Sequence, residues 1–215
     1  MKLTLDVENT VTNRNGKLHL DPFEPDNSLT LIGMLCESGK ETIVTFDHTD
    51  REHTPSGNQI VQRMLDATTL LIMHNAAHDL IWLWESGFEY DGAVFDTMLN
   101  AYVIQRGQKQ PLSLEACAER YQLDTRKQDT LKEYFKKGYS TKDIPYDELA
   151  VYLSADLHAT QQLSDRLMTQ LETDDKELAS TAKLTDEVAV CLARIYQRGF
   201  SVDKTVLDEV RVEFE

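Results

Sequence analysis

The 215-residue sequence has little of several features that define large classes of protein. It contains only three cysteines, Cys36, Cys117 and Cys191, which are far apart and form no CxxC pair. This spacing argues against a disulfide framework and against a zinc site, and it fits a reducing cytoplasm. No apolar run is long enough to predict a membrane span, and the first residues lack the apolar stretch of a secretory signal.

Basic residues are also scarce: 22 Lys and Arg stand against 37 Asp and Glu, which gives a formal net charge of -15. Because neutralising phosphates takes basic side chains, we do not expect this chain to grip a long nucleic-acid duplex tightly. Hydrophobic residues make up 41% of the sequence, enough for one sizeable core. The sequence shows no internal repeat and no low-complexity tract.

The order of the predicted elements indicates an α/β fold with a mixed central sheet flanked by helices. Alternating or β-branched runs predict strands at residues 3–8, 29–38, 41–47 and 68–75. Apolar periodicity predicts a series of helices, at residues 59–66, 76–85, 97–106, 114–123, 130–137 and 146–171. Asn75, Asp96 and Ser113 are suitable residues to cap three of these helices. We expect a main domain over residues 1–173 and a helical extension over 174–215 that packs on it or on a partner.

The first acidic motif is Asp6-Val7-Glu8, in the first predicted strand. Residues two apart in a strand point to the same face, so Asp6 and Glu8 lie side by side. Two neighbouring carboxylates repel each other unless a cation neutralises them or one is protonated. Taken alone, this tripeptide is also typical of an ordinary solvated strand face.

Two further motifs, Asn75 to Asp79 and Tyr152 to Asp156, each place two polar side chains on one helical face at i,i+4 spacing. Taken alone, Asp79 is equally explained by its favourable position at a helix N-terminus, and the second pair by an exposed amphipathic face. Together the three motifs supply four carboxylates and one phenol. This is the set needed to hold two divalent ions and hydrolyse a phosphodiester bond.

Two other patterns have a competing interpretation. His74 and His78 have the H-x-x-x-H spacing of zinc metalloproteases, but the sequence lacks the glutamate base and a third ligand, so we do not favour zinc. One segment is both basic and aromatic, and it either follows a single nucleic-acid strand or is a solvated helix face. Its residues are Arg126, Lys127, Lys132, Tyr134, Phe135, Lys136, Lys137 and Tyr139.

Taken together, the motifs resemble the proofreading 3′–5′ exonuclease domain of family A DNA polymerases, in the DnaQ-like, RNase H-like DEDD superfamily. The resemblance covers nearly the whole chain, including VFDTMLNAYVIQ and PLSLEACAERYQL between the second and third motifs. Tyr152 stands four residues before Asp156, where another branch has a histidine five residues before, so the sequence resembles the tyrosine subtype. The tail around Arg198-Gly199-Phe200 resembles the helices that lead into a polymerase domain. The motifs also have a phage-like character, which favours a bacterial or phage-infected host cytoplasm.

The resemblance implies a role for each motif residue. Asp6, Glu8 and Asp156 are expected to bind one Mg²⁺ or Mn²⁺ ion, with Asp6 bridging to a second ion that Asp79 holds mostly through water. Tyr152 is expected to orient the attacking water, since its phenol is a poor base at neutral pH. Asn9, Thr10 and Asn75 flank the carboxylates and are candidates to hold the terminal nucleotide.

The implied reaction is the release of nucleoside 5′-monophosphates from single-stranded or frayed 3′ DNA ends, with a polymerase domain or subunit as partner. An exoribonuclease of the same superfamily is the main alternative, because that distinction depends on contacts to the 2′-hydroxyl. A non-catalytic module that docks a polymerase is a second alternative. Such a module would be expected to lack a carboxylate, and none is missing here.

Overall fold

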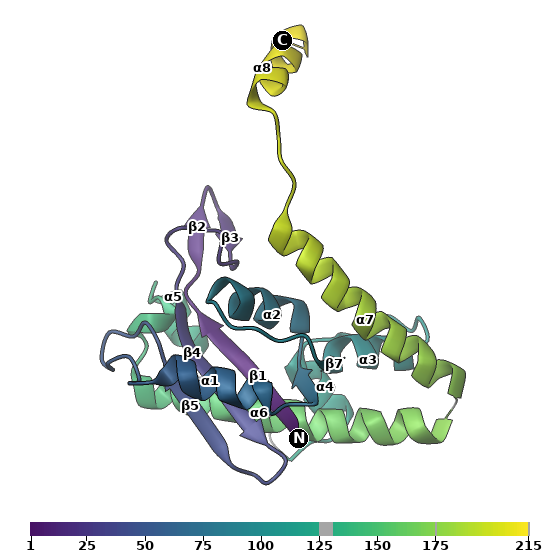
Figure 1. The fold of residues 1–215 in the computed structure, drawn as a ribbon. Helices are drawn as coiled ribbons and strands as arrows, with labels where there is room; N and C mark the ends of the chain where they lie inside the picture. Colours follow the sequence, from purple (N-terminus) through teal and green to yellow (C-terminus); the bar gives the residue numbers. More distant parts are fainter. Residues whose placement is uncertain (125–130, 175, 215) are drawn as a thin grey trace.

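The structure is a computed structural model that describes residues 1–124, 131–174 and 176–214. A five-stranded sheet lies between helices, with the strand order β5-β4-β1-β6-β7 (Figure 1). Strands β5, β4 and β1 pair antiparallel, whereas β1, β6 and β7 pair parallel, so the predicted mixed sheet is confirmed. The strands are β1 (Lys2–Asn9), β4 (Leu29–Cys36), β5 (Glu41–Thr45), β6 (Leu70–Met73) and β7 (Ala93–Asp96).

Helices occupy the segments between and after these strands. They are α1 (Gly57–Asp66), α2 (Ala76–Glu85), α3 (Thr97–Ile104), α4 (Leu114–Arg120), α5 (Lys132–Lys136), η2 (Thr141–Asp143), α6 (Tyr146–Asp174), α7 (Lys176–Arg198) and α8 (Lys204–Phe214). Asp96 and Ser113 cap α3 and α4 as predicted, through side-chain oxygens that accept backbone N–H groups. The predicted cap at Asn75 is wrong, because its side chain makes no capping hydrogen bond and its backbone is left-handed.

A short hairpin of β2 (Thr12–Arg14) and β3 (Lys17–His19) follows β1 and stands clear of the main sheet (Figure 1). Asn15-Gly16 is a typical hairpin-turn pair, but the two strands beside it are not among those predicted from the sequence. Asn15 and Gly16 both have positive φ, of 53° and 78°, as the tight turn of a two-residue hairpin requires. The hairpin thus extends the path of β1 beyond the edge of the sheet.

The two faces of the sheet are covered by different helices. Leu3, Leu5 and Val7 of β1 pack in one cluster with residues of α1 and α2. On the opposite face, Leu31 and Leu35 of β4 pack against the buried leucines of α6. Because α6 crosses the face to which Asp6 and Glu8 point, the alternation along β1 directs its two acidic side chains towards that helix.

The close approach of α6 depends on Gly33 of β4, which pairs directly with Asp6. A Cβ atom at Gly33 would lie 2.7 Å from Cδ1 of Leu157 and 2.8 Å from Cγ of Leu153. Both leucines are fully buried, so they have little room to move. Any larger residue at position 33 would push α6 away from β1.

The C-terminal helices differ in how they are packed. Helix α7 contacts α2, α3, α6 and β7, and buries Ala182, Asp186 and Ala193. Helix α8 has no buried residue, and an extended stretch separates it from α7 (Figure 1). In the described part of the chain, no helix combines the length and apolarity needed to cross a membrane.

We predict that Gly33→Ala lowers the free energy of unfolding by about 1–3 kcal/mol, because the added methyl overpacks the contact with α6. Urea denaturation measures this loss. The combined variant Gly33→Ala, Leu153→Ala should lose less than the sum of the two single variants, since the smaller side chain makes room for the methyl. An unchanged midpoint for Gly33→Ala, or strictly additive losses, would contradict the proposed packing.

Candidate active site

Asp6 and Glu8 lie near the end of β1, at the point where this strand parts from β6. The parallel pairing between β1 and β6 covers Lys2 to Thr4, which leaves the later residues of β1 without a strand on that side. There the backbone N–H of Val7 donates instead to Oδ1 of Asp79, at 3.2 Å. The third carboxylate therefore comes to the strand that carries the first two.

Asp79 is in an unfavourable place for a negative charge. Its side chain is 2% exposed, and burial raises its pKa well above the usual range. The charges of Asp6, Asp96 and Glu8 raise this pKa further, while the hydrogen bond from Val7 opposes the rise. This mutual repulsion shows that Asp6, Glu8 and Asp79 are close enough in space to interact.

Asp156 and Tyr152 lie one turn apart on α6, the helix that covers the face of the sheet to which Asp6 and Glu8 point. Asp156 shares a helical face with Ala159 and Leu163, which pack in a cluster with Ile72 of β6. Tyr152 packs against the other cluster, in which Leu153 and Leu157 cover β4. Asp156 is 6% exposed, and its convergence with Asp6 and Glu8 stays a prediction.

The donor set of this site fits a hard divalent cation. All four acidic residues offer oxygen atoms, and a cation among them would relieve the repulsion that raises the pKa of Asp79. Within residues 1–124, 131–174 and 176–214, no three of the acidic, histidine or cysteine side chains are already arranged so that they could hold a metal ion.

Of the three candidate nucleotide-binding residues, Asn9 and Thr10 already make hydrogen bonds within the protein, and Asn75 is exposed. The Asn9 side chain donates to the carbonyls of Thr10 and Leu20, and its Oδ1 lies 2.9 Å from Nε2 of His78. The Thr10 hydroxyl oxygen accepts the N–H of Ser28 at 2.7 Å. Asn75 is exposed beside the start of α2. Of the three, Asn75 has the side chain most open to a ligand, and nucleotide binding by all three stays a prediction.

Asp96 is a residue whose full role the sequence analysis missed. It was expected to cap α3 only, but its carboxylate also accepts the N–H of Asn75 at 3.1 Å and that of Ala76 at 2.8 Å. It therefore caps α2, the helix that carries Asp79, in place of Asn75. No local signal reveals this, because the contact joins two helices that are separate in sequence.

The two histidines do not form a zinc pair. His74 lies between the Thr97 hydroxyl, at 2.9 Å from Nδ1, and the Leu112 carbonyl, at 3.0 Å from Nε2. His78 instead faces Asn9, and burial lowers its pKa. His74 thus joins the start of α3 to the segment before α4, and His78 joins α2 to the end of β1.

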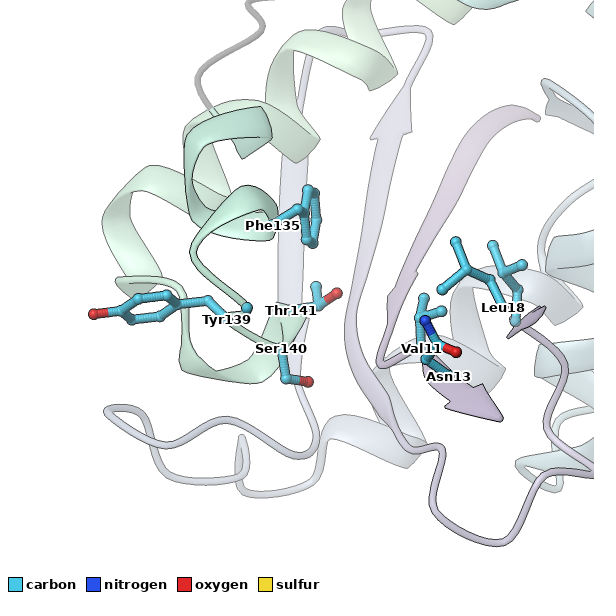
Figure 2. A pocket seen from close by; sticks show the side chains of 9 residues that line it. Val11, Asn13, Leu18, Phe135, Tyr139, Ser140 and Thr141 are labelled. Carbon is cyan, nitrogen blue, oxygen red and sulfur yellow. The ribbon is translucent and has the colours of Figure 1, made fainter. Parts of the chain in front are cut away.

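A cavity of about 610 Å³ opens beside the end of β1. Figure 2 shows Val11 and Leu18 on the hairpin side facing Phe135 and Thr141 on the helix side. The lining is mostly apolar, and Leu18 is 64% exposed. We call this cavity the hairpin groove; its lining residues are Val11, Asn13, Leu18, Leu20, Phe135, Gly138, Tyr139, Ser140 and Thr141.

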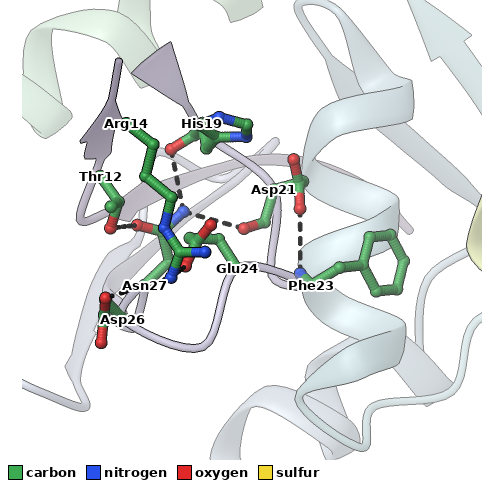
Figure 3. Close-up of polar contacts among 8 residues, drawn as sticks. All are labelled: Thr12, Arg14, His19, Asp21, Phe23, Glu24, Asp26 and Asn27. Carbon is green, nitrogen blue, oxygen red and sulfur yellow. Dashed lines mark hydrogen bonds and ion pairs between the residues drawn. The ribbon is translucent and has the colours of Figure 1, made fainter. Parts of the chain in front are cut away.

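The hairpin that forms one wall of the groove is held firmly at its base (Figure 3). Arg14 pairs with the buried Glu24 at 2.5 Å. The Asn27 amide donates to the carbonyls of His19 and Asp21, both at 2.9 Å, and its oxygen accepts from the Thr12 hydroxyl. These contacts join both strands to the loop that follows them, so the wall is fixed rather than loose.

The basic and aromatic segment is only partly described. Arg126 and Lys127, and the side chain of Lys132, lie outside the described residues. Lys136 pairs with Glu133 at 2.9 Å, while Phe135 and Tyr139 line the hairpin groove. Phe135 and Tyr139 therefore belong to the groove, Tyr134 packs against the leucine cluster of α6, and Lys136 lies on an exposed helix surface.

A mixed sheet that carries acidic residues on its first strand, with further carboxylates from two flanking helices, defines the RNase H-like class of exonucleases. A family model described as 3′–5′ exonuclease matches residues 19–172, a range that includes Asp79, Tyr152 and Asp156 but begins after Asp6 and Glu8. The chain belongs to the family of 3′–5′ exonuclease domains of family A DNA polymerases. Exonucleases of this family use divalent metal ions.

Individual relatives agree with this assignment. The DNA polymerase of Bacillus phage SP01 is 26% identical over 238 residues, which cover 100% of this chain and 25% of that protein. The chain thus spans about a quarter of the length of this relative. Among solved structures, Brucella melitensis NrnC with bound Mg²⁺ matches with a TM-score of 0.58 and 17% identity, over 94% of this chain and 90% of that one. Escherichia coli RNase D, an exoribonuclease involved in structured RNA processing, matches with a TM-score of 0.60 and 17% identity, over 93% and 46%.

The raised pKa of Asp79 predicts how the metal-free protein responds to pH. A carboxyl whose pKa is higher in the folded state stabilises the fold fully below its unfolded value, near 3.8, and loses that contribution as pH rises through the folded value. We therefore expect the melting temperature in chelator to fall as pH increases from about 4 towards neutrality. Asp79→Asn should flatten this fall, because the amide has no charge to bury and can still accept from Val7.

Differential scanning calorimetry of both proteins across this pH range, with chelator, makes the comparison. Addition of Mg²⁺ should raise the melting temperature of the wild type more at pH 8 than at pH 5. If the melting temperatures of wild type and Asp79→Asn fell by the same amount over this pH range, the pKa of Asp79 would not be raised in the folded state.

Proposed function

We propose that this domain hydrolyses DNA from the 3′ end, one nucleotide at a time, and releases nucleoside 5′-monophosphates. The observation that carries the proposal is the burial of Asp79 beside Asp6 and Glu8, a repulsive cluster that makes sense as a cation site. Two divalent ions, Mg²⁺ or Mn²⁺, are the proposed cofactors, because the donor set is oxygen only.

The proposed roles are those that the resemblance implies. Asp6, Glu8 and Asp156 would hold one ion, and Asp6 would also serve the second. Asp79 would act on the second ion mostly through water, which agrees with its Oδ1 already accepting the N–H of Val7. When bound, the ions lower the pKa of the attacking water and stabilise the departing 3′ oxygen. Tyr152, on the face of α6 that carries Asp156, orients that water through its hydroxyl.

The hairpin groove supplies a route for the strand. It continues from the end of β1, a few residues beyond Glu8, and its apolar walls suit the faces of unstacked bases. The site residues proposed in the described part of the chain are suited to metal and phosphate rather than to base edges, so little sequence preference is expected. With a net charge of -15 the domain lacks a broad positive surface, which favours a frayed or single-stranded end over a duplex.

A polymerase domain is the proposed partner. Helix α7 exposes an apolar stripe at helical spacing, made of Leu184, Val188, Leu192 and Ile195, and α8 buries none of its residues. Such surfaces are typical of segments that another domain covers. The similarity to a phage DNA polymerase about four times longer points to the same kind of partner.

RNA is the alternative substrate, favoured by the fold similarity to RNase D. The site residues bind phosphates and metal, so they do not separate the two substrates. One experiment tests both: 5′-labelled DNA and RNA oligonucleotides of the same sequence, incubated with Mg²⁺ or with chelator. We expect stepwise shortening of the DNA from its 3′ end in Mg²⁺ only, and slower shortening of the RNA.

The variant Asp6→Ala, Glu8→Ala should reduce this digestion by at least about 10³-fold, because it removes the bridging carboxylate and its neighbour. Circular dichroism and thermal melting should show that the fold is intact. Val151→Ala, at an exposed position of α6, is the matched control and should cleave at the wild-type rate. Undiminished cleavage by the double variant would refute the assigned site, and faster digestion of RNA would reassign the substrate.

A further inference from the structure

Asp186 is a buried carboxylate for which the proposed mechanism has no use. It lies on α7 and is 5% exposed, on the same buried helix face as Ala182 and Ala193. An acidic side chain on such a face is costly unless specific hydrogen bonds satisfy it. The contacts of Asp186 therefore indicate what the residue is for.

The contacts of Asp186 lead to the junction between β7 and α3. Its Oδ1 accepts the backbone N–H of Asp96 at 3.2 Å. The Asn100 amide donates to both of its oxygens, at 3.0 and 2.9 Å, and also to the backbone carbonyl of Asp96 at 2.9 Å. Asp186 and Asn100 together hold the backbone of Asp96 on both its N–H and its carbonyl.

The side chain of Asp96 in turn binds the first residues of α2. Its two oxygens accept the N–H groups of Asn75 and Ala76, the first groups of the helix that carries Asp79. Asp79 lies one helical turn further on and accepts the N–H of Val7 in β1. A continuous set of hydrogen bonds thus runs from α7, through Asp96 and α2, to the acidic site.

We propose that Asp186 is a positioning residue: by fixing Asp96 it sets the N-terminus of α2 and hence the placement of Asp79. It follows that exonuclease activity depends on how α7 is seated against the domain. This inference rests on the proposed function of the acidic site. It concerns a residue outside all three acidic motifs, on the helix that precedes α8.

Protonation of Asp186 should modulate this contact. Burial raises its pKa to about 7, and the charges of Asp96 and Glu187 add to the rise, while hydrogen bonds from Asn100 and Asp96 oppose it. Because the folded pKa is raised, the stabilisation is full below pH 3.8 and is lost as pH rises through about 7. The two ionisable groups that act on Asp186 are both acidic: Asp96 at the β7–α3 junction and Glu187 on α7 itself.

The test compares three variants of the whole chain. Asp186→Ala removes both acceptor oxygens, Asp186→Asn keeps one for the N–H of Asp96, and Cys191→Ala is the control. Cys191 is an exposed residue of α7. Three measurements are made on each protein: kcat and KM on labelled oligonucleotides, Mn²⁺ affinity by electron paramagnetic resonance, and the amide NMR shifts of Asn75 and Ala76.

We expect Asp186→Ala to lower kcat and Mn²⁺ affinity by about tenfold each, in the range found for residues that orient metal ligands, with KM changed by less than about twofold. The amide signals of Asn75 and Ala76 should move. Asp186→Asn should restore kcat to within about twofold of wild type, and Cys191→Ala should match wild type. A folded Asp186→Ala variant with wild-type kcat, Mn²⁺ affinity and amide shifts would overturn the proposal.

A measurement on proteins that keep their packing decides the question if Asp186→Ala does not fold. The Asn75 and Ala76 amide shifts of the wild type should titrate between pH 5.5 and 8.5 with a component centred near the raised pKa of Asp186, about 7. Asp186→Asn should lose that component. Identical titrations in the two proteins overturn the proposal. If the wild type cleaves neither DNA nor RNA, the proposed function fails, while Mn²⁺ binding and the amide shifts still test Asp186.

Discussion

The burial of Asp79 beside the half-buried Asp6 and Glu8, near the end of β1, is the constraint on which this structure depends. Burial raises the pKa of Asp79, and the negative charges of Asp6, Asp96 and Glu8 raise it further. A protein optimised only for stability would place an apolar residue there, as buried ionic groups are often replaced without loss. Retaining the carboxylates costs stability in the absence of metal, and a divalent cation would turn the same cluster into a favourable one.

The rest of the architecture serves to bring these side chains together. Strand β1 parts from β6 after Thr4, which opens a gap that Asp79 fills by accepting the N–H of Val7. Gly33 lets α6 pack closely on the other side, so that its polar face reaches the same strand. Asp96 then fixes the helix that carries Asp79, and Asp186 fixes Asp96. Each contact joins segments distant in sequence, which explains why the site needs almost the whole chain.

The sequence predicted the features that arise from local order. Alternation in residues 3–8 predicted β1 and the shared face of Asp6 and Glu8, and apolar spacing predicted α6. It did not predict the contacts that arise only on folding. The Asn75 cap was wrong because the carboxylate of Asp96, from another strand, takes the N–H groups of α2. The strands of the hairpin were missed because each has three residues, too few for a periodic signal, although Asn15-Gly16 marked the turn.

A single cation site formed by Asp6, Glu8, Asp79 and Asp156 can be located by anomalous diffraction from crystals of the protein soaked in Mn²⁺. Manganese scatters anomalously, so its position is found without reference to the fold. We expect manganese peaks among these four carboxylates, one of them in contact with Asp6. Peaks confined to other surface acidic residues, with these four side chains bare at saturating Mn²⁺, would show that the four carboxylates do not form one site.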